Sequence, residues 1–301
     1  MSTREIGGVE FDLDPSRVGL YVVLLAMVAF YLAPLESGLM TAFKTNEAFF
    51  SSTPFSPPSL SGATLQPWFD AWARLQGPLT NTNGALFNSL LMAVPATMGS
   101  ALLGSIAAYG LTNVDWRGQT VVLLLFVAGM FVPYQSVLVP LTRFWSIVGL
   151  SSLLAGVPFL ADRAGLIALT VTHTAYGIPI CTVLFRAYYA TLDESMLEAA
   201  RLDGATVAGV YTKIVLPLSV PIFAVTLIYQ FTQIWNDLLF ALVLVSQPSN
   251  EVVTIALNKL QGSMVQQFNL QMAGAFVAAL PTLVVYVLFG EQFAEGVAGE
   301  R

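Results

Sequence analysis

The sequence carries very little charge. Only 10% of its 301 residues are Asp, Glu, Lys or Arg, and Lys accounts for three of the twelve basic residues. A soluble globular domain carries about 25% charged residues, so this chain could not cover an ordinary water-facing surface. Hydrophobic residues make up 56% of the chain, and its mean hydropathy is +0.72. The composition predicts a membrane protein, and its acid-rich, Lys-poor balance hints at a high-salt host.

Other absences exclude classes of function. The single Cys181 cannot form an intramolecular disulfide, and the single His173 leaves no His or Cys pair at metal-ligand spacing. A net charge of −6 leaves no basic stripe for nucleic acid. The chain has no G-x-x-x-x-G-K-[ST] loop to hold phosphates, so any ATP must be bound by another polypeptide. The apolar stretches contain no nucleophile–base pair and no paired carboxylates, which argues against an intramembrane enzyme.

Six long stretches are uncharged or nearly so, and a helix needs about 20 apolar residues to cross the hydrocarbon core of a bilayer. These stretches are residues 18–35, 85–111, 119–142, 164–185, 219–245 and 270–290. No period of 20–50 residues repeats along the chain. We therefore expect an all-α polytopic membrane protein with six transmembrane helices, in which residues 1–301 form a single transmembrane domain. The loop over 36–84, rich in Pro, Ser and aromatic residues, is either an ordered cap or a plain linker.

The Lys and Arg residues of the connecting loops predict the orientation, because cytoplasmic loops carry an excess of them. With both termini in the cytoplasm, seven basic residues lie inside and five outside. The inner set is Arg4, Arg17, Arg117, Arg186, Arg201, Lys213 and Arg301, and the outer set is Lys44, Arg74, Arg143, Arg163 and Lys259. This orientation places the loop over 193–217 in the cytoplasm.

Two helix faces carry a pattern. In the second stretch, Ser100, Gly104 and Ala108 repeat every four residues, which predicts a seam for close helix packing. In the fifth, polar residues at steps of four, three and four indicate one polar face, with aromatic and amide neighbours. The set comprises Thr226, Tyr229, Gln230, Gln233, Trp235, Asn236 and Asp237. Such a face either lines a path for a polyhydroxylated solute or only bonds to neighbouring helices.

Two further features leave alternatives open. Asp237 and His173 are either proton or ion carriers or structural groups that each make buried hydrogen bonds. Pro133 and Pro140 interrupt the third stretch, and the break they predict is either a gate or a static kink.

The loop over 193–217 forms a charged elbow between two apolar stretches. Ser195 and Glu198 have the spacing of a capping box that starts a helix, and Gly204 is a natural helix stop. A second short helix is predicted to open near Thr206, and Pro217 then interrupts the chain before the fifth apolar stretch. One apolar stripe of this helix consists of Val207, Val210, Tyr211, Ile214 and Val215. An interfacial helix lying on lipid usually has a Lys/Arg-rich polar face. The acid-rich balance of this elbow favours a protein partner instead.

The elbow resembles the signature of the permease subunits of ABC importers: E-A-A, three residues, Gly, nine residues, then I-x-L-P. "FNSLLMAVPAT", "AAYGL", "VPYQSVLVPL" and "WNDLLFALVL" are similar to the carbohydrate-uptake branch, on the side of the smaller, six-span subunit of the maltose-type permease pair. By this resemblance the residues that couple to the ATPase are Glu198, Ala199, Ala200, Arg201, Asp203, Gly204, Ala205, Ile214, Leu216 and Pro217. The C-terminal "AEGVAGER" is more acidic than the corresponding tail of the family.

The resemblance implies a mechanism and a set of partners. The elbow would dock into a cleft on a cytoplasmic ATPase dimer, which binds ATP and Mg²⁺, and would act as a lever that switches the spans between inward-open and outward-open states. A second, related permease subunit would complete the translocation pathway. An extracytoplasmic solute-binding protein would deliver the sugar. The competing hypothesis is a proton- or ion-coupled secondary transporter that uses Asp237 or His173.

Overall fold

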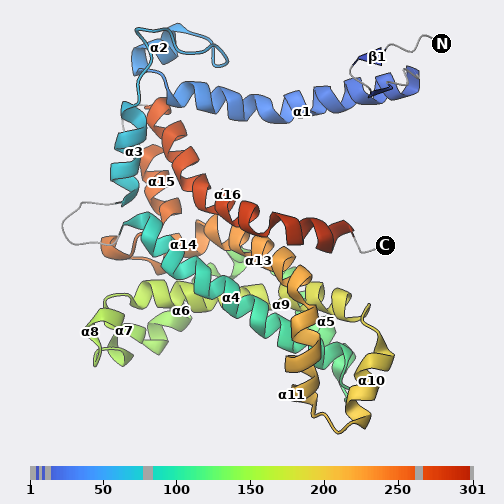
Figure 1. Ribbon diagram of the computed structural model, residues 1–301. Helices are drawn as coiled ribbons and strands as arrows, with labels where there is room; N and C mark the ends of the chain where they lie inside the picture. Colours follow the sequence, from blue (N-terminus) through green and yellow to red (C-terminus); the bar gives the residue numbers. More distant parts are fainter. Residues whose placement is uncertain (1–4, 7–8, 11–14, 77–83, 262–266, 299–301) are drawn as a thin grey trace. The chain divides into compact units, whose positions relative to one another are not determined.

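The computed structural model describes residues 5–6, 9–10, 15–76, 84–261 and 267–298. Apart from the paired strands β1 (Glu5–Ile6) and β2 (Val9–Glu10), its regular elements are helical (Figure 1). The helices are α1 Pro15–Ala42, α2 Asn46–Ser51, α3 Gln66–Gln76, α4 Ala85–Thr112, α5 Gln119–Met130, α6 Tyr134–Val148, α7 Leu150–Leu153, α8 Pro158–Ala161, α9 Ala164–Tyr189, α10 Glu194–Leu202, α11 Val207–Val210, η1 Tyr211–Val215, α12 Leu216–Leu218, α13 Val220–Trp235, α14 Leu239–Leu244, η2 Pro248–Asn250, α15 Val253–Gln261 and α16 Phe268–Ala298. The all-α expectation is confirmed.

Five described helices are long and apolar enough to cross a membrane, or six if the bent pair 207–218 and 220–235 counts as one span. The chain divides into two compact units. Unit 1 contains Met1–Trp72 and Ser263–Val277, and unit 2 contains Ala73–Gly262 and Ala278–Arg301. The description of residues 1–301 as one permease domain stays a prediction.

In unit 1, the loop after α1 is an ordered cap over the residues described. Lys44 is fully buried, and its ammonium group donates to Thr53 O at 2.8 Å. Asn269, at the start of α16, donates to Lys44 O at 2.9 Å. Of the two alternatives for this loop, the ordered cap is therefore correct for the described residues. Residues 77–83 of this loop lie outside the described part of the chain. The same holds for Arg4 and Arg301, near the two ends of the sequence.

In unit 2, α4 and α9 pack along the predicted seam of small residues. Ser100, Gly104 and Ala108 are all buried. A Cβ atom on Gly104 would lie only 2.4 Å from the Cβ of Cys181 in α9. Small side chains at this spacing let the two backbones approach closely, so the packing seam is confirmed. Helix α13 packs against both α4 and α9 and completes a three-helix centre.

The stretches over 119–142 and 219–245 are not single helices, which corrects the sequence expectation. Helix α5 ends at Met130 and α6 begins after Pro133, because proline cannot donate a backbone hydrogen bond inside a helix. With 12 residues, α5 is only about 18 Å long, and the membrane-length helix of this region is Tyr134–Leu153 instead. In the fifth stretch, α13 ends at Trp235 and α14 starts at Leu239.

Candidate functional site

The elbow comprises α10, α11, η1 and α12, and it lies at one end of unit 2, away from α6, α7 and α8 (Figure 1). Its first helix is capped by Asp193 and not by Ser195, which corrects the predicted capping box. Asp193 Oδ1 accepts hydrogen bonds from the backbone N–H of Ser195 at 2.9 Å and from its hydroxyl at 2.8 Å. These hydrogen bonds lower the pKa of Asp193. The Asp193 carboxylate binds the hydroxyl of Ser195, and Ser195 therefore does not cap the helix itself.

The stop at Gly204 has the predicted geometry. Its φ of +83° lies in the left-handed region that glycine adopts without steric strain. The N–H of Ala205 donates to Ala200 O, and the N–H of Gly204 donates to Arg201 O, both at 3.0 Å. This pair of hydrogen bonds is the Schellman motif, which satisfies the last carbonyl groups of α10. The elbow therefore turns sharply at a fixed point.

The second arm of the elbow opens at Thr206, as predicted, where the hydroxyl accepts from Gly209 N at 3.1 Å. The helix then widens into the π-helical turn η1 and continues as α12. It meets α13 at a bend of 76° beside Ser219. The fully buried Val210 and Val215 belong to the predicted apolar stripe of this arm.

The inner face of the elbow packs on α4 and α9. Leu197, Val210 and Val215 join one buried cluster with residues of α4 and α9, among them Ala101, Ala108, Tyr109, Cys181, Phe185 and Tyr189. Tyr109 donates to Val207 O at 3.1 Å, and Arg201 donates to Asn113 O at the end of α4. The elbow is therefore anchored to the two central helices of unit 2 by both apolar packing and hydrogen bonds.

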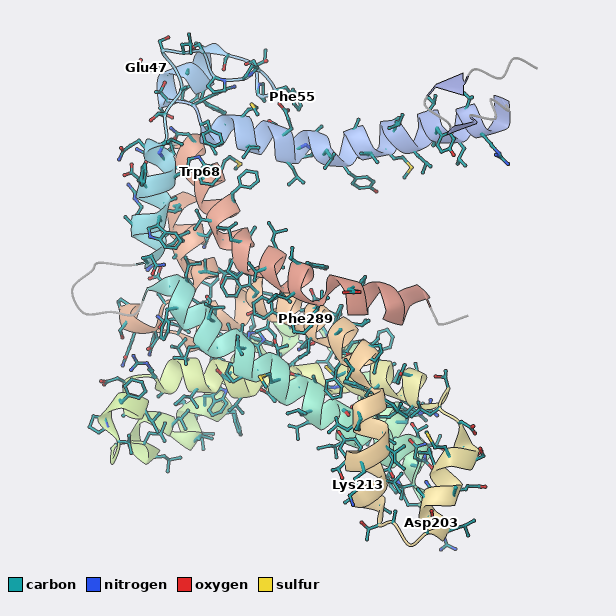
Figure 2. All side chains as sticks on the ribbon, viewed as in Figure 1. Glu47, Phe55, Trp68, Asp203, Lys213 and Phe289 are labelled. Carbon is teal, nitrogen blue, oxygen red and sulfur yellow. The ribbon has the colours of Figure 1, made fainter. Side chains whose placement is uncertain are left out.

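The outer face of the elbow is exposed, and it carries most of the predicted coupling residues. Figure 2 shows Asp203 at the tip, with Lys213 on the second arm. The exposed members are Glu198, Ala199, Arg201, Asp203, Gly204, Ala205 and Pro217, and the half-buried members are Ala200, Ile214 and Leu216. Leu202, with 88% of its surface exposed, is a further residue of the tip that the motif does not include. An apolar residue between the charged Arg201 and Asp203 is the sequence signal that could have identified it.

The predicted polar face of α13 is divided between two environments. Thr226 and Gln230 are buried, and Gln230 Nε2 lies 2.2 Å from where a Cβ on Gly177 would stand. Gln233 is exposed, and its amide donates to Tyr229 OH at 3.3 Å. Gln233 follows Gln230 by three residues, so its side chain points about 60° away around the helix axis. This rotation is enough to place Gln233 outside the packed contact that buries Gln230. Asn236 is exposed as well.

Trp235 and Asp237 make contacts within the chain. The Trp235 indole donates to Ala278 O at 2.9 Å, and its ring stacks on Phe231, a placement that favours the packing alternative for this residue. Asp237 Oδ2 accepts from Phe240 N at 3.1 Å and lies 3.5 Å from His173 Nε2. The two side chains of this pair are 6% and 4% exposed. Both residues were candidates from the sequence, but 64 positions separate them and no sequence pattern pairs them.

An aromatic cluster that no sequence pattern predicted lies next to this pair. Phe240 stacks on Tyr134 with ring centroids 4.8 Å apart, and it contacts Tyr176 and His173 edge-on. Tyr134 starts α6 and Phe240 lies in α14, so the cluster joins the two interrupted stretches to α9. Aromatic contacts therefore stabilise the chain at both breaks, the one between α5 and α6 and the one between α13 and α14.

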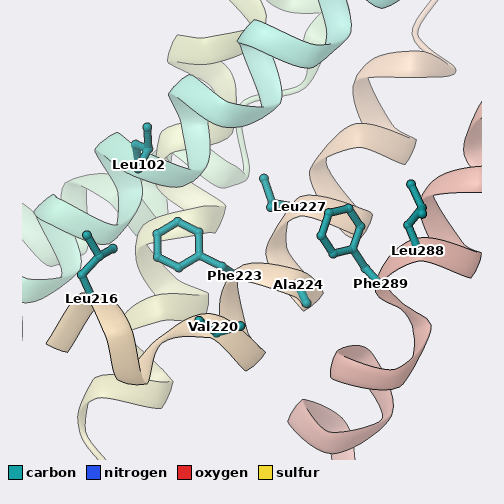
Figure 3. Close-up of a pocket in the computed structure, with 8 residues that line it drawn as sticks. All are labelled: Leu102, Leu216, Val220, Phe223, Ala224, Leu227, Leu288 and Phe289. Carbon is teal, nitrogen blue, oxygen red and sulfur yellow. The ribbon is translucent and has the colours of Figure 1, made fainter. Parts of the chain in front are cut away.

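A hollow of about 420 Å³ between α4, the α12–α13 bend and α16 is lined only by apolar side chains (Figure 3). Its lining residues are Leu102, Leu216, Val220, Phe223, Ala224, Leu227, Leu288 and Phe289. A hydroxyl moved from water to a site without a hydrogen-bond partner loses about 1–3 kcal/mol. This hollow therefore does not suit a polyhydroxylated solute.

The chain is similar to proteins of known family along nearly its whole length. The family model described as the inner membrane component of binding-protein-dependent transport systems matches residues 100–291, which include the elbow and α13. The xylose/arabinose import permease protein XacI of Haloferax volcanii is 46% identical over 305 residues, covering 98% of this chain and 96% of that protein. The glucose import system permease protein GlcU of Saccharolobus solfataricus is 29% identical over 288 residues, covering 93% of each chain.

A solved structure shares the fold. A chain of a bacterial ABC transporter involved in the import of the acidic polysaccharide alginate matches with a TM-score of 0.70, over 95% of this chain and 100% of that chain, at 18% identity. The comparisons give no support to the alternative of a secondary transporter, and they identify a membrane subunit instead of an enzyme. The chain belongs to the family of binding-protein-dependent inner membrane components, as a permease subunit of the carbohydrate-uptake branch of ABC importers.

Proposed function

We propose that this permease subunit couples sugar import to ATP hydrolysis through its elbow, which docks on a cytoplasmic ATPase dimer that binds ATP and Mg²⁺. The proposal is carried by the structure of the elbow. Its first helix is capped by Asp193 and terminated by Gly204, and the elbow packs on α4 and α9. A second, related permease subunit forms the other half of the pathway. An extracytoplasmic binding protein delivers the sugar.

The chemistry of the tip supports docking on protein. Leu202 projects an almost fully exposed apolar side chain between Arg201 and Asp203, and Glu198 is exposed one turn earlier. Interfacial helices that lie on lipid carry Lys/Arg-rich polar faces, which this tip lacks. An apolar side chain with a rim of charges of both signs has the layout of a protein-binding face, in which a desolvated core is surrounded by polar residues.

The proposed orientation of the chain in the membrane follows from the basic residues of its loops. Counted with the six stretches predicted from the sequence, seven basic residues fall on the side of both termini and the elbow and five on the other side, which favours cytoplasmic termini. The elbow and the ATPase then share one compartment. The binding protein delivers the sugar on the other side of the membrane.

The substrate we propose is a pentose such as xylose or arabinose. The support is the name of the relative that is 46% identical over nearly the whole chain. Tyr229, Gln233 and Asn236 present an exposed aromatic ring and two amide groups, which suit the ring and hydroxyl groups of a sugar. We propose these three as pathway-lining residues of this subunit.

The docking face is tested with Leu202→Asp and the matched control Leu202→Met. The ATPase subunit is co-purified with this permease from membranes, and the amount retained is measured. We expect Leu202→Asp to weaken retention about 30-fold, as for an interface hot spot worth about 2 kcal/mol, because a carboxylate cannot replace an apolar anchor. Leu202→Met keeps the apolar contact and should retain the ATPase. Equal retention by the Asp variant and the native chain would exclude this docking face.

A further inference from the structure

Four hydroxyl groups from four parts of unit 2 meet beneath the second arm of the elbow. Ser105 Oγ of α4 lies 2.6 Å from Tyr189 OH of α9 and 2.8 Å from Tyr211 OH of η1. Ser219 Oγ, at the bend into α13, lies 3.3 Å from the same Tyr189 hydroxyl. Ser105, Tyr189 and Ser219 are almost completely buried. We refer to these four residues as the hydroxyl clamp.

The clamp is a connected set and not three separate contacts. A hydroxyl has one proton to donate and two lone pairs to accept with. Ser105 has a tyrosine hydroxyl on either side, so at least one of the two tyrosines donates to it. Ser105 and Tyr189 are buried, so water is excluded from the hydrogen bond between them. Removing Ser105 deprives both tyrosine hydroxyls of a partner, whereas Ser219 keeps its hydrogen bond to Val215 O. The set therefore favours a single arrangement of the elements that supply it.

The clamp fixes the arm at both of its irregular points. Tyr211 begins the π-helical turn, and Ser219 stands at the 76° bend where the arm meets α13. One turn along α4 from Ser105, the ring of Tyr109 lies 5.2 Å from that of Tyr211, and its hydroxyl binds Val207 O. A π turn inside a helix often marks a functional site, and here side-chain bonds hold it to two helices of the bundle.

We infer that the hydroxyl clamp transmits displacement of the elbow to α4 and α9, and that its four members are positioning residues for coupling. The inference rests on the proposed function, because it assumes that an ATPase moves the elbow. Without the clamp, the arm would yield at the π turn or at the bend. The ATPase would then hydrolyse ATP without driving the spans.

The test uses Tyr211→Phe and Ser105→Ala, each in the complex purified with its partner subunits and reconstituted into vesicles. Tyr211→Phe removes only an oxygen and keeps the ring beside Tyr109. The matched control is Thr212→Ala, which removes an exposed hydroxyl bonded only to Ala208 O of its own helix. Radiolabelled xylose and arabinose report uptake, and phosphate release reports hydrolysis. We expect uptake per ATP to fall about fivefold or more in both clamp variants and to stay unchanged in the control.

A purely structural role would lower the yield of the complex without changing uptake per ATP. That result, with Tyr211→Phe assembled and coupled as in the native complex, would overturn the inference. If Ser105→Ala does not assemble, Tyr211→Phe decides alone. Loss of the ATPase in Leu202→Asp with normal coupling in Tyr211→Phe would leave the proposed function standing and reject the clamp. An ATPase retained and coupled in Leu202→Asp would reject the docking face at Leu202, and the clamp would still be decided by Tyr211→Phe.

Discussion

At the scale of single residues, the closest contacts of unit 2 depend on missing side chains. A Cβ on Gly177 would lie 2.2 Å from Gln230 Nε2 and 2.4 Å from Ser100 Oγ, so three helices meet at this glycine. Gly104 has the same role one turn further along, against Cys181. Helices embedded in lipid gain their stability from such close packing, because lipid tails are as apolar as their side chains.

Gly177→Ala should therefore destabilise the subunit. Adding a methylene-sized group to a packed interior lowers the free energy of unfolding by about 1–3 kcal/mol. We expect a lower midpoint of thermal unfolding for the detergent-purified complex than for the native chain. The matched control is Gly110→Ala on α4, where a Cβ would meet nothing within 4 Å. There the midpoint should stay the same or rise slightly, because alanine favours a helix over glycine. If both variants unfold at the native midpoint, the close approach at Gly177 is not a determinant of stability.

At the scale of elements, α13 presents one side to the bundle and another away from it. Gln230 is 5% exposed between α4 and α9, whereas Gln233 is exposed next to Tyr229. The same residue type therefore serves packing at one position and is available to a solute at the other. The two glutamines should respond differently to the same substitution.

Gln233→Ala should lower pentose uptake about fivefold, the effect of one lost hydrogen bond of about 1 kcal/mol, with no change in thermal stability. Gln230→Ala should lower the free energy of unfolding by about 1–3 kcal/mol, because it leaves a cavity at the contact of three helices. Uptake in vesicles and thermal unfolding, measured on both variants, check the two expectations. The reverse pattern, with Gln233→Ala unstable and Gln230→Ala intact but inactive, would contradict this division of α13.

At the scale of the whole molecule, the buried His173–Asp237 pair bears on the source of energy. The pair links α9 to the break between α13 and α14, and Asp237 also caps the first turn of α14. These contacts give both residues a structural role in joining elements. They do not require either residue to carry protons.

Uptake by the complete complex should therefore require ATP and not a proton gradient. In vesicles without ATP, uptake should fall at least about tenfold, and a protonophore added in the presence of ATP should leave it unchanged, since ATP binding and not protonation drives the change of state. His173→Gln is the companion variant: it loses any proton carrier but should remain ATP-dependent. Gradient-driven uptake without ATP that His173→Gln abolishes would restore the secondary transporter.

The sequence by itself determined the class of the protein and the place of its elbow. A chain with so few charged residues and such long apolar stretches cannot cover a water-facing surface with polar groups. Its composition alone therefore required a membrane fold. Gly204 and Thr206 act through backbone geometry within a few residues, and both have the predicted roles. The seam over Ser100, Gly104 and Ala108 was readable because helical periodicity places every fourth residue on one face.

Only the tertiary structure decided which residues meet. Periodicity gives the face of one helix but not its neighbour, so it could not separate Gln230 from Gln233 or pair His173 with Asp237. It also could not show that Ser105, Tyr189, Tyr211 and Ser219, up to 114 positions apart in the sequence, share one set of hydrogen bonds. Local signals act over one or two helical turns. Contacts between helices depend on the whole packed bundle, and they determine how the elbow is held.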